Sequence, residues 1–181
     1  MKEKKRTVVK LTILACVIVF IFGMVNAVWY FGYKKTYDDY AGNMEINDIG
    51  FEDGARYQAI VEDCLCQLKM PSYLGYGGYL TVQNAESASY EMDENGNIVN
   101  GDEKTVILHI WPQAFGNDYT YGVSLLSPAE TVQIMIQKDG SIVPQSNENT
   151  ELDEYNEALL ADYQEEIAHF LEIARTLWGI E

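Results

Sequence analysis

The residues in this sequence best suited to contact a ligand are tyrosines. The chain holds 13 of them among 181 residues, and tyrosine offers the large, rigid, amphipathic contact area that recognition sites favour. Tyr73, Tyr76 and Tyr79 fall in a glycine-rich stretch, and Tyr119 and Tyr121 fall on one face of a predicted strand. We therefore predict these five as ligand-binding residues. The alternative is that they line the sheet and the edges of the core.

Histidine and acidic residues occur at spacings that suggest metal sites, but neither pattern is complete. Glu166 and His169 have the spacing of carboxylate-bridged metal sites in helix bundles, which also need carboxylates from other helices. An EF-hand loop that began at Asp93 would need Gly sixth and Glu twelfth, where this chain has Ile98 and Lys104. We predict no bound metal and no cofactor.

Nucleophilic and phosphate-binding motifs are missing from the sequence. It has no glycine-rich phosphate loop, no G-x-S-x-G and no H-E-x-x-H. His109 shares a predicted strand face with Ile107 and Trp111, which favours a packed, hydrogen-bonded side chain. We predict no catalytic residue, although acidic residues are numerous enough to keep a carboxylate-based hydrolase as an alternative.

Two cysteines lie close together at Cys64 and Cys66, within a predicted helix. Residues two apart on a helix point about 200° apart, so these two cannot form a disulfide there. We place Cys64 in the core. Cys66 lies off the apolar stripe and is expected to be a free thiol, with a cross-link to a second copy of the chain as the alternative.

Charge is distributed very unevenly along the chain. Seven of the 12 basic residues and one acidic residue lie in positions 1–35, which leaves 5 bases and 27 acids, a formal charge of −22, in residues 36–181. Such a surface repels phosphate backbones, so we expect no nucleic-acid partner.

A membrane-spanning helix is the strongest pattern in the sequence. Residues 11–33 carry no charge, and a helix of that length is about 34 Å long, enough to cross a bilayer. The basic residues in 1–10 predict a cytoplasmic N-terminus in the cell membrane, with the remainder extracytoplasmic. A signal-peptidase site after Ala27 is one alternative, and lipid attachment at Cys16 is a weaker one.

The rest of the chain divides into a linker and one domain. Residues 34–50 are polar and aperiodic, which indicates a juxtamembrane linker, and residues 51–181 form the predicted domain. At its start, apolar residues recur at spacings of 3 and 4 from Asp53 to Met70, which predicts an amphipathic helix that ends at Pro71.

The pattern then changes to period 2. We predict strands at 80–83, 105–111 and 119–126, and hairpins at Asn95-Gly96 and Asp139-Gly140, two dipeptides that suit tight type I′ turns. Residues 105–111 are apolar on both faces and are expected to be the central strand. The sheet should be antiparallel, with about five strands.

A long amphipathic helix is predicted to close the chain at 151–178. The expected fold class is therefore α+β: a transmembrane helix, then a two-layer domain whose two amphipathic helices cover one face of the sheet. Function is expected to be that of a single-pass binding or accessory module that contacts an envelope protein, a membrane protein or a ligand. A membrane-anchored hydrolase and a structural subunit of a membrane complex are the alternatives, and the sequence leaves the oligomeric state open.

Overall fold

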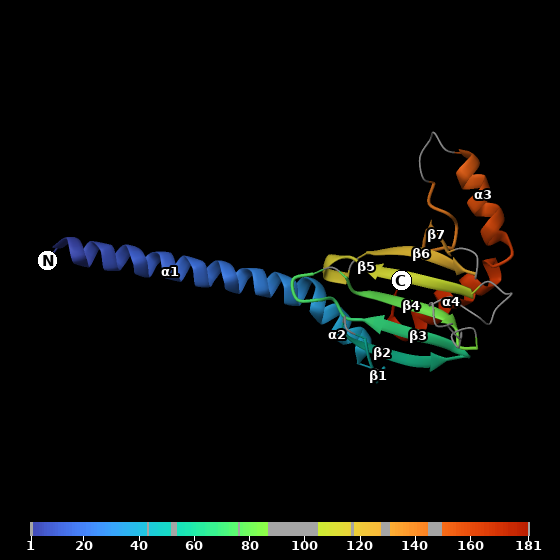
Figure 1. Ribbon diagram of the computed structural model, residues 1–181, viewed down its shortest axis with the longest axis horizontal. Coiled ribbons are helices and arrows are strands. Elements are labelled where there is room, and N and C mark those ends of the chain that lie inside the picture. Colours follow the sequence, from blue (N-terminus) through green and yellow to red (C-terminus); the bar gives the residue numbers. More distant parts are fainter. Residues whose placement is uncertain are drawn as a thin grey trace, which may run out of the picture.

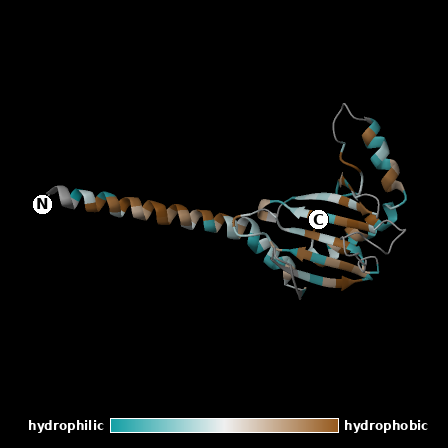
Figure 2. Ribbon diagram, viewed as in Figure 1, coloured by the Kyte–Doolittle hydropathy of each residue, from teal (hydrophilic) through white to brown (hydrophobic). Residues whose placement is uncertain are grey.

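The chain begins with a helical rod that projects from a β-sheet domain (Figure 1). The computed structural model describes residues 2–42, 44–51, 54–75, 77–86, 105–116, 118–127, 131–144 and 150–180. The rod consists of α1 (Lys2–Trp29), a π-helical turn η1 (Tyr30–Lys34) and α2 (Lys35–Ala41). Within the described residues it is the one helix long and apolar enough to cross a membrane, and Figure 2 shows its hydrophobic length standing free of the domain. This agrees with the predicted span at 11–33.

The domain is built on an antiparallel sheet in which every strand pairs with its neighbours in sequence. The strands in spatial order are β1 (Glu45–Phe51), β2 (Gly54–Val61), β3 (Cys64–Lys69), β4 (Tyr79–Asn84), β5 (Thr105–Pro112), β6 (Tyr119–Leu126) and β7 (Thr131–Ile136). β2 to β7 already make six strands, and β1 adds a further edge strand. The sheet is thus larger than the five strands expected.

The main correction concerns the helix predicted from Asp53 to Met70, which is instead the hairpin β2–β3. Cys64 and Leu68 are four residues apart, a spacing that fits one face of a helix and also one face of a strand. Glu62 and Asp63 form the turn, with φ of 48° and 63°, and Val61 pairs with Cys64. Turns with positive φ at both central residues usually contain Asn-Gly or a similar dipeptide. The dipeptide Glu62-Asp63 is not of that kind, so the sequence did not predict a hairpin here.

The strands predicted at 80–83, 105–111 and 119–126 are confirmed as β4, β5 and β6. The turn at Asp139-Gly140 is also present: Gly140 has φ of 87°, and the returning chain makes a single bridge from Ile136 to Ile142. The hairpin predicted at Asn95-Gly96 lies outside the described residues.

The predicted C-terminal helix is two helices, α3 (Thr150–Ala161) and α4 (Gln164–Trp178). The helix breaks at Tyr163, whose φ of −113° is not helical. α4 covers one face of the sheet and lies against β3, β4 and β5. Its buried side chains face the core: Ile167, Phe170, Leu171, Ile173, Ala174 and Trp178.

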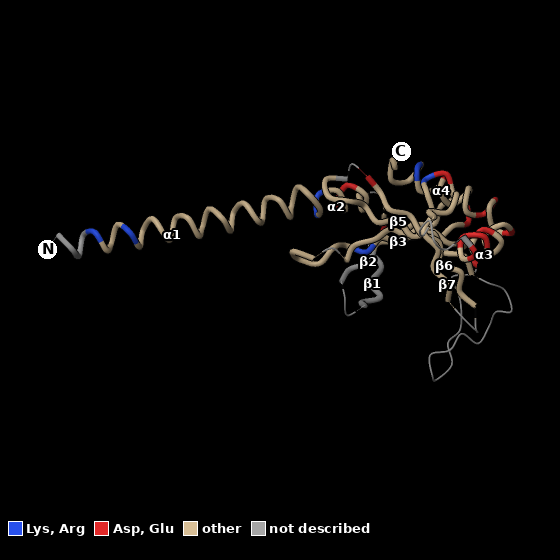
Figure 3. Tube along the Cα trace, turned by 90° about the horizontal axis from the view of Figure 1, so that it is seen from above, with Lys and Arg blue, Asp and Glu red and all other residues tan. Residues whose placement is uncertain are grey.

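The second helix on that face is α2 rather than a helix at 53–70. Figure 3 shows α2 and α4 on the same side of the sheet. Residues 34–50, expected as a linker, contain α2 and most of β1. The core face of the sheet, as set by the strand register, carries these buried side chains: Cys64, Cys66, Leu68, Leu80, Val82, Val106, Leu108, Ile110, Tyr121, Val123, Leu125, Ile134 and Ile136.

Two tyrosines of α2 join the rod to the sheet. Tyr37 is 3% exposed, and its ring lies directly over Gly78, where a Cβ atom would come within 2.7 Å of the ring and 2.9 Å of the Pro71 nitrogen. The hydroxyl of Tyr40 is hydrogen-bonded to that of Tyr119 over 2.8 Å. Because the helix is continuous from α1 to α2, these contacts also set the direction in which α1 leaves the domain.

The close approach of Tyr37 to Gly78 gives a matched pair of variants. Gly78→Ala should lower the free energy of unfolding by about 1–3 kcal/mol, because the added methyl overlaps the ring and backbone. Gly77→Ala should change it much less, since nothing lies within 4 Å of the position its Cβ would take. Thermal unfolding of the full-length protein in detergent measures both. Equal stability of the two variants would contradict this packing.

Both domain cysteines lie inside the core, which corrects the placement of Cys66. They project from the same side of β3, and Cys64 and Cys66 are 3% and 0% exposed. Both are free thiols. Burial raises the pKa of the Cys66 thiol to about 12, so neither the surface position nor the cross-link considered from the sequence fits this structure.

Thiol labelling tests this placement. In Cys16→Ser protein, a maleimide at pH 7 should modify neither remaining cysteine in the folded state and both after denaturation, because a buried, protonated thiol is a poor nucleophile. Mass spectrometry counts the adducts. Rapid labelling of Cys66 in folded protein would show that it is exposed.

Candidate ligand-binding face

The sheet face opposite α2 and α4 carries no helix in the described part of the chain. We call it the open face. The strand register places the following residues on it: Gln58, Ile60, Leu65, Gln67, Lys69, Tyr79, Thr81, Gln83, Ile107, His109, Trp111, Thr120, Gly122, Ser124, Gln133 and Met135. Apart from Lys69 these side chains are uncharged or, for His109, titratable. The face therefore combines aromatic, aliphatic and neutral hydrogen-bonding groups.

Three aromatic rings form a row across β4 and β5 on the open face. His109 and Trp111 stack with ring centroids 5.5 Å apart and planes 8° apart. Tyr79 meets His109 edge to face at 6.4 Å, and Lys69 Nζ lies 5.7 Å from the Tyr79 ring centroid. All three rings are half-buried, so each is supported by the sheet while part of its surface stays accessible. We call Tyr79, His109 and Trp111 the aromatic row.

Gly122 on β6 allows Trp111 to lie against the sheet. A Cβ atom at this position would come within 3.0 Å of Trp111 Cζ3 and 3.2 Å of Cη2. Any other residue type would push the indole away from the sheet. The orientation of the largest ring in the row thus depends on a glycine one strand away.

Polar side chains lie in the rows next to the aromatic groups. Thr81, Gln83 and Ser124 are only 4%, 7% and 8% exposed. The Oε1 atom of Gln83 is buried and has no hydrogen-bond partner among the described atoms. An unpaired buried acceptor is unfavourable, and a ligand hydroxyl or amide that reached it would supply the missing donor.

Burial also controls the charge of the aromatic row. It lowers the pKa of His109 below its ordinary value of 6.5, because desolvation disfavours the imidazolium form. The imidazole is therefore neutral at neutral pH. On the central strands β4 to β6, the described residues of the open face include no Asp or Glu.

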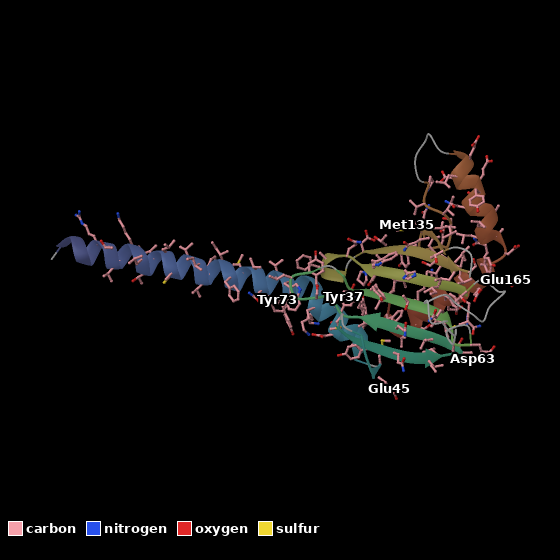
Figure 4. All side chains as sticks on the ribbon, in the orientation of Figure 1. Tyr37, Glu45, Asp63, Tyr73, Met135 and Glu165 are labelled. Atoms are coloured by element: carbon pink, nitrogen blue, oxygen red, sulfur yellow. The ribbon has the colours of Figure 1, made fainter. Side chains whose placement is uncertain are left out.

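The four described tyrosines among the five predicted from sequence do not form one site. Tyr79 belongs to the aromatic row. Tyr73 is 58% exposed and lies in the β3–β4 loop against α1, away from the aromatic row (Figure 4). Tyr76 lies outside the described residues. Tyr119 and Tyr121 belong to the sheet face that α2 and α4 cover.

Tyr119 and Tyr121 do border a surface hollow. It measures about 550 Å³ and is lined by Asp118, Tyr119, Thr120, Tyr121, Met135, Ile136, Gln137, Lys138 and Val143. Tyr121 is 7% exposed, and the Tyr119 hydroxyl is engaged by Tyr40. Their main contacts are thus within the protein, as in the alternative interpretation.

The acidic cluster on the last helix gathers no further metal ligands among the described residues. Glu166 is half-buried, and burial raises the pKa of its carboxyl, while His169 opposes that shift. Among the described residues, no group of three or more His, Cys, Asp or Glu side chains is placed to hold an ion.

Sequence reasoning missed most of the aromatic row. It recognised that His109 and Trp111 share a strand face but assigned that face to packing, and it placed Lys69 at the end of a helix. The occurrence of His109 and Trp111 on one face of the predicted strand was the usable signal. That Trp111 lies over Gly122 depends on pairing with another strand, which the sequence pattern does not reveal.

Known proteins give no further guide to this face. No protein-family model, no curated protein and no solved structure matches the chain. Its function must be inferred from the geometry.

The shifted pKa of His109 predicts a pH effect on stability. A histidine whose pKa is lower in the folded than in the unfolded state does not reduce the free energy of unfolding above its ordinary pKa. As pH falls below about 6.5, the unfolded state binds a proton more readily, so the free energy of unfolding falls. The stability of the wild type should therefore drop more steeply between pH 6.5 and 5 than that of His109→Gln. Chemical unfolding at a series of pH values measures the difference, and parallel curves would contradict a buried neutral imidazole.

Proposed function

We propose that this protein is a membrane-anchored binding module whose open face binds a neutral glycan chain. The observation that carries the proposal is the aromatic row, in which Trp111 lies over Gly122 and stacks on His109. No helix among the described residues covers it. Planar rings of this kind offer apolar surface to the flat faces of sugar rings, while a few placed polar groups supply orientation.

The polar groups of the open face suit a ligand rich in hydroxyl and amide groups. Gln83 holds an unpartnered buried acceptor. Ser124 lies in the same cross-strand row as Gln83, and Thr81 lies in the next row. Charge favours a neutral ligand, because residues 36–181 have a formal charge of −22 and repel polyanions. Binding through stacking and neutral hydrogen bonds avoids that repulsion.

The anchor supports a location at a membrane surface. α1 is long and apolar enough to span, and Figure 3 shows basic residues near its free end and acidic residues concentrated on α3 and α4. The positive-inside rule then favours a cytoplasmic N-terminus and an extracytoplasmic domain. Glycans of the cell envelope would be within reach of a domain so placed.

Binding is favoured over hydrolysis on this face. Glycoside hydrolysis needs two carboxyl groups that flank the scissile bond. The described residues of the open face on β4 to β6 supply none, whereas they supply an aromatic platform. This argues for recognition without cleavage.

The test is glycan binding by the full-length protein in detergent. A panel of neutral oligosaccharides, including β-linked glucose and N-acetylglucosamine oligomers, should yield a binder whose affinity falls at least about fivefold in Trp111→Ala, since an aromatic contact is worth about 1 kcal/mol. Tyr155→Ala is the matched control, because Tyr155 on α3 is an aromatic residue that is 53% exposed and belongs to a different element.

Thermal unfolding should show that both variants remain folded. If no neutral oligosaccharide binds, or if Trp111→Ala and Tyr155→Ala bind equally well, the open face is not a glycan site.

A further inference from the structure

The loop between β3 and β4 is held against the end of α1. The hydroxyl of Tyr73 donates a hydrogen bond to Asn26 Oδ1 over 2.5 Å, and the Tyr73 ring meets Trp29 edge to face at 5.0 Å. Asn26 Nδ2 in turn donates to the Phe22 carbonyl at 2.8 Å. Figure 4 shows Tyr73 beside the rod, at the end of the domain opposite Asp63.

These contacts lie within the uncharged span rather than beyond it. Asn26 precedes Tyr33, the last residue of that span, by seven residues, which is about 10 Å along a helix. When α1 crosses a membrane, its turns near Asn26 and Trp29 lie where acyl chains meet headgroups. The loop that touches them must lie at the same depth.

The composition of the loop suits that depth. No charged residue occurs from Met70 to Ala85, in a domain that is otherwise strongly acidic. At its tip Leu74 is 48% exposed with a left-handed φ of 57°. Exposing the apolar side chain of Leu74 to water is unfavourable, and its backbone conformation is unfavourable as well. At a membrane interface the side chain would bury apolar surface, which is favourable.

A second loop tip has the same character. Phe115, between β5 and β6, is 55% exposed and has φ of 67°. Its ring lies 3.5 Å from the position of a Cβ on Gly32, in the π-helical turn of the rod. Two neighbouring loops thus present apolar tips at the end of the domain from which α1 leaves.

An apolar groove separates the β3–β4 loop from α1. It measures about 400 Å³ and is lined by Met24, Val25, Val28, Trp29, Tyr33, Leu74 and Gly75. Trp29 Nε1 is buried without an acceptor among the described atoms. A groove with this apolar lining and one unpaired donor on a lining residue suits the upper acyl chain and ester carbonyl of a phospholipid.

We propose that the tip of the β3–β4 loop is embedded in the membrane leaflet next to the domain, with a phospholipid chain in the groove beside α1. The contacts of Tyr73 fix its depth, and Leu74 and Phe115 provide the inserted apolar surface. The loop stays at the interface, where water still reaches its backbone polar groups. This inference rests on the membrane anchoring included in the proposed function, but not on glycan binding.

Depth-dependent fluorescence quenching tests the proposal on the full-length protein. In a Cys16→Ser background, Leu74→Cys is labelled with an environment-sensitive fluorophore and reconstituted into phosphatidylcholine and phosphatidylglycerol vesicles. Nitroxide placed high on the lipid acyl chain should quench this label at least twofold more than the same label at Ile60→Cys. Ile60 is 71% exposed on the open face, next to the turn at the distal end of the domain. A label at Phe115→Cys gives a second measurement at the inserted surface.

A label at Phe22→Cys reports independently on the span. The inserted loop is supported if lipid nitroxide quenches the labels at Leu74 and Phe115 about as much as the label at Phe22, and if aqueous iodide quenches only the label at Ile60. Lipid quenching at Phe22 with iodide quenching at Leu74 and Phe115 overturns the inserted loop and leaves the anchor intact. Iodide quenching at all four positions overturns both the anchor and the inserted loop.

Discussion

The arrangement of this molecule depends on the packing of Tyr37 over Gly78. The rod is one continuous helix, so whatever holds α2 also aims α1. Tyr37 achieves this because the missing side chain at Gly78 lets its ring approach the backbone of the β3–β4 loop. The hydrogen bond between Tyr40 and Tyr119 adds a second point of attachment between α2 and the sheet.

The same packing determines where the aromatic row lies relative to α1. Gly78 directly precedes Tyr79, and Trp111 lies near the end of β5, so the aromatic row lies at the end of the sheet closest to α1. The strands run roughly along the direction of the rod (Figure 1). If α1 crosses a membrane as proposed, the open face would lie roughly parallel to the membrane normal and would not face the bilayer. A chain bound across the aromatic row would then run close to the membrane surface.

The largest error in the sequence-based prediction, the helix from Asp53 to Met70, has a clear physical cause. Cys64 and Leu68 satisfy a helix and a strand equally well, and the turn residues Glu62 and Asp63 resemble a charged helix surface. What decides between them is pairing with β4, where Cys66 lies opposite Val82 and Leu68 opposite Leu80. That pairing places Cys64, Cys66 and Leu68 on the face that α2 and α4 cover, where they are buried. The burial outweighs the helical propensity of the segment.

The sequence by itself determined the features that reside in local composition. These are the apolar span of α1, the period-2 strands at β4, β5 and β6, the apolar stripe of α4 and the acidic surface. Only the tertiary structure decided that residues 54–69 pair as a hairpin, that Tyr73, Tyr79 and Tyr119 lie on different surfaces, and that Trp111 rests on Gly122. Each of these depends on a contact between strands or loops that no local periodicity encodes, because sheet register and close approach are set by the partner segment.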